Sequence, residues 1–145
     1  MENKLTEELR RFNYLVGGID QVYHEAALKL GLSDSEMAVL YTICGEGKPC
    51  PLSLICRLAG LSKQTANSAL RKLENSGVIR LEAVDGKQKS AALTDKGRTL
   101  AEHTVSKIIS AENRIFDSWT ERERTEYIRL TQNYLNAFRA EIDKL

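Results

Sequence analysis

The sequence predicts a mainly helical fold in which long helices at both ends flank a central lobe that closes with a β-hairpin. Three observations support this fold class. Apolar residues recur every three to four positions near both ends of the chain, which is the period of an amphipathic helix. After Gly77 the period falls to about two, as in a strand. A length of 145 residues, with 42% hydrophobic and 28% charged residues, is typical of one soluble globular domain.

The first helix is expected to occupy the first thirty residues. Its apolar seam consists of Leu5, Leu9, Phe12, Val16, Ile19, Tyr23, Ala26 and Leu30. So small a domain cannot cover a helix of this length, and we expect the seam to meet another long helix, such as one from a second chain. Gly17 and Gly18 interrupt the helix. They predict a kink, a close approach by a neighbouring helix, or a tolerated cost of about 1 kcal/mol each.

The helices that follow have recognisable ends. Gly31 closes the first helix, and residues 33–36 form a capping box that opens a second one. The apolar face of this second helix is Met37, Leu40, Tyr41 and Cys44. The turn-rich segment 45–49 predicts a connector. Pro51 suits the first turn of a short third helix, which Gly60 ends.

A fourth helix and a hairpin complete the lobe. Ser62 caps the helix, and its buried stripe is expected to be Ala66, Ala69, Leu70 and Leu73. Alternation from Ile79 predicts a strand, Asp85 and Gly86 a hairpin turn, and the return to Leu93 a second strand. The sequence therefore predicts a two-stranded wing.

Two long helices are expected to finish the chain. Thr94 caps one that runs from Asp95 to about Ser118, and the capping box 120–123 opens the last. The last helix repeats the seam spacing with Ile128, Thr131, Leu135, Phe138, Ile142 and Leu145. Both termini thus present seams without a partner in the chain. The predicted dimer contacts are Leu5, Leu9, Phe12, Leu135, Phe138 and Ile142.

The charge is unevenly distributed along the chain. The net charge is only +1, but residues 57–98 hold nine Lys or Arg and four Asp or Glu, a net charge of +5. A basic segment of this kind is the electrostatic footprint expected for contact with phosphates, although a solvated surface also fits it.

Hydropathy and cysteine content predict a cytoplasmic protein. No apolar run approaches the ~20 residues that span a bilayer, and the N-terminal segment is charged, unlike a signal peptide. Cys44, Cys50 and Cys56 are an odd number in a short window, which suits a reducing compartment. We therefore expect free thiols and no membrane partner.

Residues 51–93 follow the order of a winged helix-turn-helix: short helix, glycine turn, amphipathic helix and hairpin. A major groove about 12 Å wide admits one helix that shows polar groups outward. The outward residues of the fourth helix are Ser62, Lys63, Gln64, Thr65, Asn67, Ser68, Arg71 and Lys72. Amides suit adenine, arginine suits guanine, and hydroxyls and lysine suit phosphates. On the wing, Lys87 and Lys89 are placed for a minor groove.

The segment LSLICRLAGLSKQTANSALRKLENSGVI, residues 52–79, resembles the helix-turn-helix of the MarR family. Residues 85–87 followed by 93–97 are similar to the family's wing signature, Asp-x-Arg and then Leu-Thr-x-x-Gly. Lys87 stands where the family usually has Arg, and Leu81 replaces a common basic residue. Because lysine lacks the planar guanidinium, we expect weaker groove readout by this wing.

The resemblance implies a transcription regulator, commonly a repressor, that binds a palindromic operator in double-stranded DNA as a homodimer. Residues 1–32 and 98–145 would be dimerisation helices, and residues 33–97 the DNA-binding lobe. Family members commonly bind a small aromatic or phenolic effector between these parts. The candidate pocket residues here are Tyr14, Tyr23, His24 and Tyr41, which also fit an ordinary core.

Other functions fit the residues less well. Some relatives sense oxidants through a cysteine, and Cys50 is the candidate because an expected loop places it near Lys48. His24 and His103 stand apart, so no metal site is predicted. No phosphate loop, nucleophile elbow or His-Glu-x-x-His motif is present, so we predict neither an enzyme nor a cofactor. A winged helix that binds protein would show apolar residues over 62–72, where none stands outward.

Overall fold

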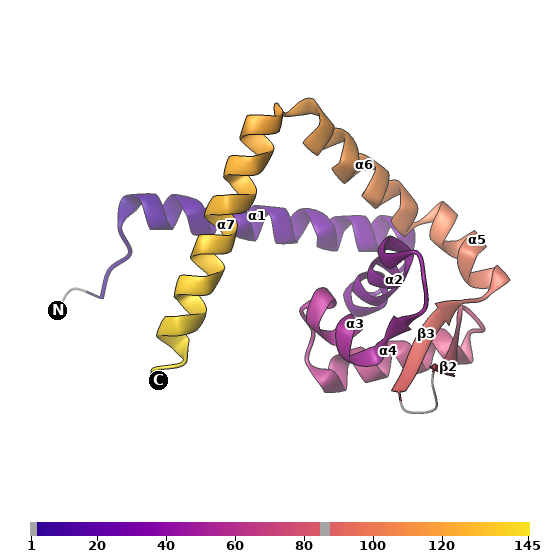
Figure 1. Ribbon diagram of the computed structural model, residues 1–145. Helices are drawn as coiled ribbons and strands as arrows, with labels where there is room; N and C mark the ends of the chain where they lie inside the picture. Colours follow the sequence, from indigo (N-terminus) through magenta and orange to yellow (C-terminus); the bar gives the residue numbers. More distant parts are fainter. Residues whose placement is uncertain (1–2, 85–87) are drawn as a thin grey trace. The chain divides into compact units, whose positions relative to one another are not determined.

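The computed structural model describes residues 3–84 and 88–145 (Figure 1). Its elements in chain order are α1 (Glu7–Leu30), α2 (Asp34–Glu46), β1 (Cys50–Pro51), α3 (Leu52–Ala59), α4 (Lys63–Asn75), β2 (Ile79–Val84), β3 (Gln88–Leu93), α5 (Asp95–His103), α6 (Val105–Ser118) and α7 (Glu121–Ile142). The mainly helical winged-helix fold class is confirmed. The chain divides into two compact units, residues 1–108 and residues 109–145.

Helix α1 is continuous from end to end. The Thr6 hydroxyl accepts a hydrogen bond from the Leu9 amide at 3.2 Å, and Gly31 ends the helix in the left-handed region at φ 72°. A Cβ built at Gly17 or Gly18 would meet no described heavy atom within 4 Å. The glycines therefore neither break the helix nor mark a close approach within the described part of the chain.

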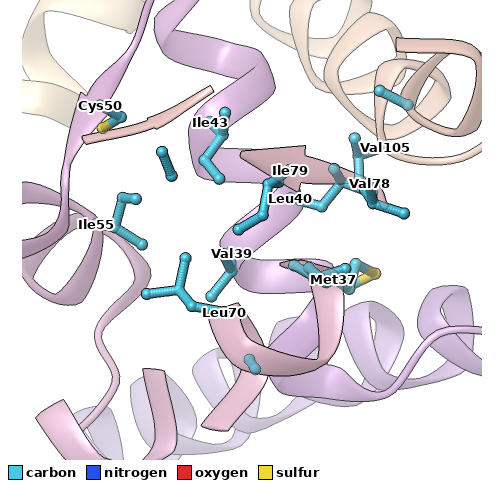
Figure 2. Packing of buried hydrophobic residues seen from close by; sticks show 14 of the residues in the cluster. Met37, Val39, Leu40, Ile43, Cys50, Ile55, Leu70, Val78, Ile79 and Val105 are labelled. Carbon is cyan, nitrogen blue, oxygen red and sulfur yellow. The ribbon is translucent and has the colours of Figure 1, made fainter. Parts of the chain in front are cut away.

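The core of the first unit forms around α2 (Figure 2). Helices α3 and α4, strand β3 and helix α5 all contact α2, so Val39, Leu40 and Ile43 are buried together. The predicted face of α2 is therefore only part of its buried surface. Helix α4 buries Ala66, Ala69, Leu70 and Leu73, which confirms the predicted stripe.

The sheet has three antiparallel strands in the order β1-β3-β2. Strands β2 and β3 pair from Ile79 with Leu93 to Val84 with Gln88, and β1 adds the pair of Cys50 with Ala91. The prediction of a two-stranded wing after a plain connector was therefore incomplete. Two residues are too few to show a period, and Pro51 is acceptable because β1 lies at the edge of the sheet.

The helix predicted from Asp95 to Ser118 is broken at Thr104, which separates α5 from α6. Thr104 has φ −127° and ψ −96°, outside the helical region. Its side-chain hydroxyl donates to the Leu100 carbonyl at 2.6 Å, and such bonds compete with the helical ladder. Thr104 and Val105 are both buried. The break therefore allows the side chains of two adjacent residues to pack in the core.

The second unit consists of most of α6 followed by α7. The Thr120 hydroxyl accepts from the Glu123 amide at 3.1 Å, and the Glu123 carboxylate accepts from the Thr120 amide at 2.9 Å. This confirms the predicted capping box. The Arg124 guanidinium donates to the carbonyls of Phe116 at 3.0 Å and Trp119 at 2.5 Å. The rings of Phe116, Trp119 and Tyr127 pack together, and they stabilise the corner between α6 and α7.

Many apolar residues in the seams of α1 and α7 are exposed to solvent. Exposed members include Leu5, Phe12 and Ile19 before and within α1, and Leu135, Phe138 and Ile142 in α7. No residue of α7 is buried. Nevertheless, no helix within residues 3–84 and 88–145 is long and apolar enough to cross a membrane.

Candidate nucleic-acid interface

Helix α4 presents a continuous polar face opposite its buried stripe. The Ser62 hydroxyl begins the helix by accepting from the Thr65 amide at 3.1 Å, and it donates to the Thr65 hydroxyl at 2.9 Å. The structure leaves every predicted outward residue of this helix exposed: Ser62, Lys63, Gln64, Thr65, Asn67, Ser68, Arg71 and Lys72. The buried alanines and leucines thus fix one side of α4, while hydroxyl, amide and cationic groups project from the other.

The turn before α4 is held by backbone bonds. Gly60 has φ 65°, which is the left-handed region that glycine enters at no steric cost. Its amide donates to the Arg57 carbonyl at 3.3 Å, and the Leu61 amide donates to the Cys56 carbonyl at 3.2 Å. These bonds close α3. They also turn the chain at once into α4, which gives the helix-turn-helix its tight connection.

A single threonine joins the wing base to the end of α4. The Thr94 hydroxyl donates to the Gly77 carbonyl at 2.5 Å and accepts from the Gly97 amide at 3.0 Å. The Thr94 amide donates to the Val78 carbonyl at 3.1 Å. A Cβ at Gly97 would stand 1.9 Å from that carbonyl oxygen. The Leu-Thr-x-x-Gly motif is therefore a structural joint in which only glycine fits at position 97.

The structure describes only one of the two wing lysines. Lys89 is exposed on β3, opposite Ala83 of β2. Lys87 and the predicted turn at Asp85 and Gly86 lie outside the described residues. Lys89 thus lies on the hairpin, where the sequence predicted it.

The basic groups near α4 divide into paired and unpaired sets. Arg80 pairs with Glu82 at 3.2 Å, and Lys72 lies 3.9 Å from Glu36. Within the described part of the chain, Lys63, Arg71 and Lys89 form no ion pair. These three cations are therefore free to meet phosphates or base edges.

Comparison with known proteins finds a family that resembles this chain. A family model described as MarR family matches residues 30–90. The HTH-type transcriptional repressor Rv2887 of Mycobacterium tuberculosis is 29% identical over 122 residues, which cover 82% of this chain and 87% of that protein. The chain is similar to the MarR family over these residues. The family consists of transcriptional regulators rather than enzymes.

Solved MarR family structures share the fold across nearly the whole chain. A regulator from Neisseria meningitidis has a TM-score of 0.82 at 19% identity, and the match covers 96% of this chain and 99% of that one. The S. aureus MepR–DNA complex has a TM-score of 0.67 at 17% identity, with 93% and 99% covered. Rv2887 in complex with salicylic acid has a TM-score of 0.59 at 25% identity, with 92% and 99% covered.

The candidate redox cysteine is placed differently from the prediction. Cys50 lies in β1 rather than in a loop and is only 1% exposed, whereas Cys44 and Cys56 are half-buried. Burial raises the pKa of the Cys50 thiol, and Glu46 raises it further, against the opposing effect of Lys48. The neighbouring lysine therefore does not activate the thiol, because desolvation outweighs it. The short strand β1, which the sequence did not reveal, causes the difference.

The four predicted pocket residues do not all lie together in one chain. Tyr14 is 73% exposed and lines a groove on α1 with Glu7 and Arg11 among others. His24 stands ten residues later, about 15 Å along the helix, and its Nδ1 lies 2.9 Å from both carboxylate oxygens of Asp34. Tyr23 is a neighbour of His24 on α1, and Tyr41 is half-buried on α2.

The structure also shows how the potential metal ligands, including the two histidines, are arranged. No group of three or more His, Cys, Asp or Glu side chains within the described ranges is arranged to hold a metal ion. His24 pairs with Asp34, and the Nδ1 atom of His103 lies 2.8 Å from the Thr99 carbonyl. The two histidines thus serve separate helix contacts.

Proposed function

We propose that the chain is a cytoplasmic repressor that binds a near-palindromic operator in double-stranded DNA as a homodimer. The observation that carries the proposal is the outward face of α4, which is entirely polar while the opposite stripe is buried. A helix in a major groove needs this division. A module that binds protein needs apolar anchors at its centre, and residues 62–72 expose none on this face.

The residues of α4 divide by chemistry into base contacts and phosphate contacts. Gln64 and Asn67 can each form two hydrogen bonds with adenine, and Arg71 can do so with guanine. Ser62, Thr65, Lys72 and the flanking Lys63 and Ser68 suit phosphate oxygens. Lys72 is the weakest of the cations for this purpose because Glu36 lies 3.9 Å from its amine.

The wing is proposed to add a minor-groove contact through Lys87 and Lys89. A narrow minor groove attracts cations through its negative potential. Lysine is a hydrated point charge and lacks the planar fork of arginine. The wing should therefore strengthen binding without reading much sequence.

Dimerisation is proposed to bury the open seams of the terminal helices. Leu5, Leu9 and Phe12 from the N-terminal end, and Leu135, Phe138 and Ile142 from the C-terminal end, would form the contact between chains. Residues 1–32 and 98–145 would then be the dimerisation part, and residues 33–97 the DNA-binding lobe. The open apolar surface on both helices supports this proposal because monomeric proteins rarely expose such long stripes. Two-fold symmetry would place two copies of α4 about one DNA turn apart.

A small aromatic or phenolic effector is proposed to relieve binding. The salicylic acid complex of the relative Rv2887 supports this chemistry. Tyr14, Tyr23, His24 and Tyr41 are the proposed contacts. Because Tyr14 lies about 15 Å from His24 along α1, a single small ligand would need Tyr14 from the other chain of the dimer.

Selection of bound DNA from a random pool tests the proposal. A recovered near-palindrome with half-sites one turn apart is the expected result, and recovery of no common sequence would contradict it. A salt series provides the second measurement. Neutralising several phosphates makes log K fall steeply with log salt, so a flat response would exclude the DNA contact, and a monomer in sedimentation would exclude the dimer.

A further inference from the structure

One carboxylate lies beside the polar face of α4 although it belongs to another helix. Glu36 stands in the first turn of α2, and its Oε1 atom lies 3.9 Å from the Lys72 amine of α4. Helices α2 and α4 are in contact, which brings the two side chains together. The other cations of α4, Lys63 and Arg71, form no ion pair within the described part of the chain. Glu36 therefore pairs with only one of the three cations of this helix.

The Glu36 carboxylate is held in place by the cap of α2. The Ser33 hydroxyl donates to Glu36 Oε1 at 2.9 Å and accepts from the Glu36 amide at 3.2 Å. The Glu36 side chain is 23% exposed, whereas the Lys72 side chain is 74% exposed. A negative charge in the first turn of a helix is also favoured by the helix dipole. The carboxylate is thus a fixed partner for the flexible lysine side chain.

The helix cap requires an acceptor at position 36 but does not require its charge. Glutamine also serves at this third position of a capped helix, because its amide oxygen can accept from the Ser33 hydroxyl in the same way. The cap therefore leaves the negative charge next to Lys72 unexplained. Replacement of Glu36 by glutamine removes the charge and keeps the acceptor, so the two roles can be separated by experiment.

Lys72 lies at the flank of the polar face of α4. Successive residues of a helix project about 100° apart, so Lys72 is turned by that angle from Arg71, and its contact with Glu36 shows that this flank faces α2. A lysine here that met a DNA phosphate would have to leave Glu36, and the carboxylate left behind would repel the same phosphate. These two costs offset the attraction between the Lys72 amine and the phosphate.

We propose that Glu36 is a positioning residue that holds Lys72 away from DNA phosphates and thereby weakens sequence-independent binding. The inference rests on the proposed contact of α4 with DNA. Sequence-independent affinity comes almost entirely from cations that neutralise phosphates, whereas amides such as those of Gln64 and Asn67 read bases without charge. With Lys72 held by Glu36, α4 offers one effective cation fewer to phosphates. The share of the affinity that depends on base sequence is larger as a result.

The test measures binding of the full chain to a DNA duplex of unrelated sequence by fluorescence anisotropy, over roughly 50–200 mM salt. Glu36→Gln should tighten binding about threefold at the lowest salt, which is the size of effect that exposed ion pairs produce. It should also steepen the slope of log K against log salt by about 1, since Lys72 then neutralises one more phosphate. Lys72→Gln should change neither quantity in the wild-type chain but should reverse both gains in the Glu36→Gln background.

Glu74→Gln is the matched control. It removes the same charge from an exposed position on α4, but two positions along a helix it projects about 160° away from Lys72. In this background Lys72→Gln should remain without effect, and a loss as large as in the Glu36→Gln background would overturn the pairing.

Two kinds of failure can be told apart. A wild-type chain that binds this duplex while Glu36→Gln leaves the salt slope unchanged would overturn the role of Glu36 and leave the proposed function standing. A wild-type chain that binds neither this duplex nor any selected DNA would overturn the proposed function, and the role of Glu36 with it.

Discussion

Replacing Gly97 by alanine should unfold the joint between the wing base and α4. The added Cβ would stand 1.9 Å from the Val78 carbonyl oxygen, whereas ordinary contacts between carbon and oxygen begin at about 3.3 Å. The backbone must therefore shift by more than about 1 Å. That shift disrupts the two bonds, each 3.1 Å long, by which the Thr94 amide and hydroxyl hold this carbonyl.

The expected cost follows from three contributions. Overpacking costs about 1–3 kcal/mol, and each lost hydrogen bond costs about 1 kcal/mol. The higher helix propensity of alanine returns up to about 1 kcal/mol. The net loss is about 3 kcal/mol, which corresponds to a fall in Tm of roughly 10 °C for a chain of this size.

The assay is thermal unfolding followed by circular dichroism at one fixed chain concentration, since dimer formation would make Tm depend on concentration. Gly45→Ala is the matched control because Gly45 is also helical, lies in the same lobe, and has no described atom within 4 Å of an added Cβ. Its Tm should stay the same or rise slightly. A Gly97→Ala protein with the Tm of Gly45→Ala would refute the steric account of the joint.

Further predictions concern DNA binding, the thiols and pH. Arg71→Ala should weaken operator binding by about 1–3 kcal/mol and relax the sequence preference at one base pair, as measured by repeating the DNA selection; unchanged selectivity would remove Arg71 from base readout. Lys63→Ala should reduce the slope of log K against log salt by about 1 without changing the selected sequence. Cys50 should react with iodoacetamide more slowly than Cys44 and Cys56 at neutral pH, because its raised pKa and burial leave little accessible thiolate; peptide mapping that finds Cys50 modified first would contradict this. The hydrogen bonds from Thr120 lower the pKa of Glu123 below 4.5. The resulting stabilisation is therefore complete above that ordinary value and disappears as pH falls through the lowered folded pKa, so Glu123→Gln should flatten the acid side of the stability profile.

Sequence patterns predicted the elements whose signals are local. Ser62 begins α4, Thr120 begins α7 with its reciprocal cap, and Ala66 to Leu73 form the buried stripe, since caps and helical periods depend on residues only a few positions apart. The face of α4 proposed for DNA followed from the same period. These features needed no knowledge of distant contacts.

Features that depend on distant contacts were missed. Strand β1 exists because Cys50 pairs with Ala91, 41 positions later, and two residues carry no period of their own. The same pairing buries Cys50, so its thiol could not be judged from Lys48 nearby. The break at Thr104 arises where a buried hydroxyl bonds to the preceding turn, although Thr104 reads as an ordinary helical residue in sequence.

The joint around Thr94 has a consequence for how the lobe can move. One hydroxyl caps α5 and at the same time binds the carbonyls of Gly77 and Val78, and the Lys96 amine binds the Ser76 carbonyl at 2.7 Å. These bonds connect the end of α4, the wing base and the start of α5 into one rigid body. A force applied to α5 would therefore move α4 and the wing together. In the proposed dimer, the distance between the two copies of α4 would then change through rotation of whole lobes and not through bending of the hairpin.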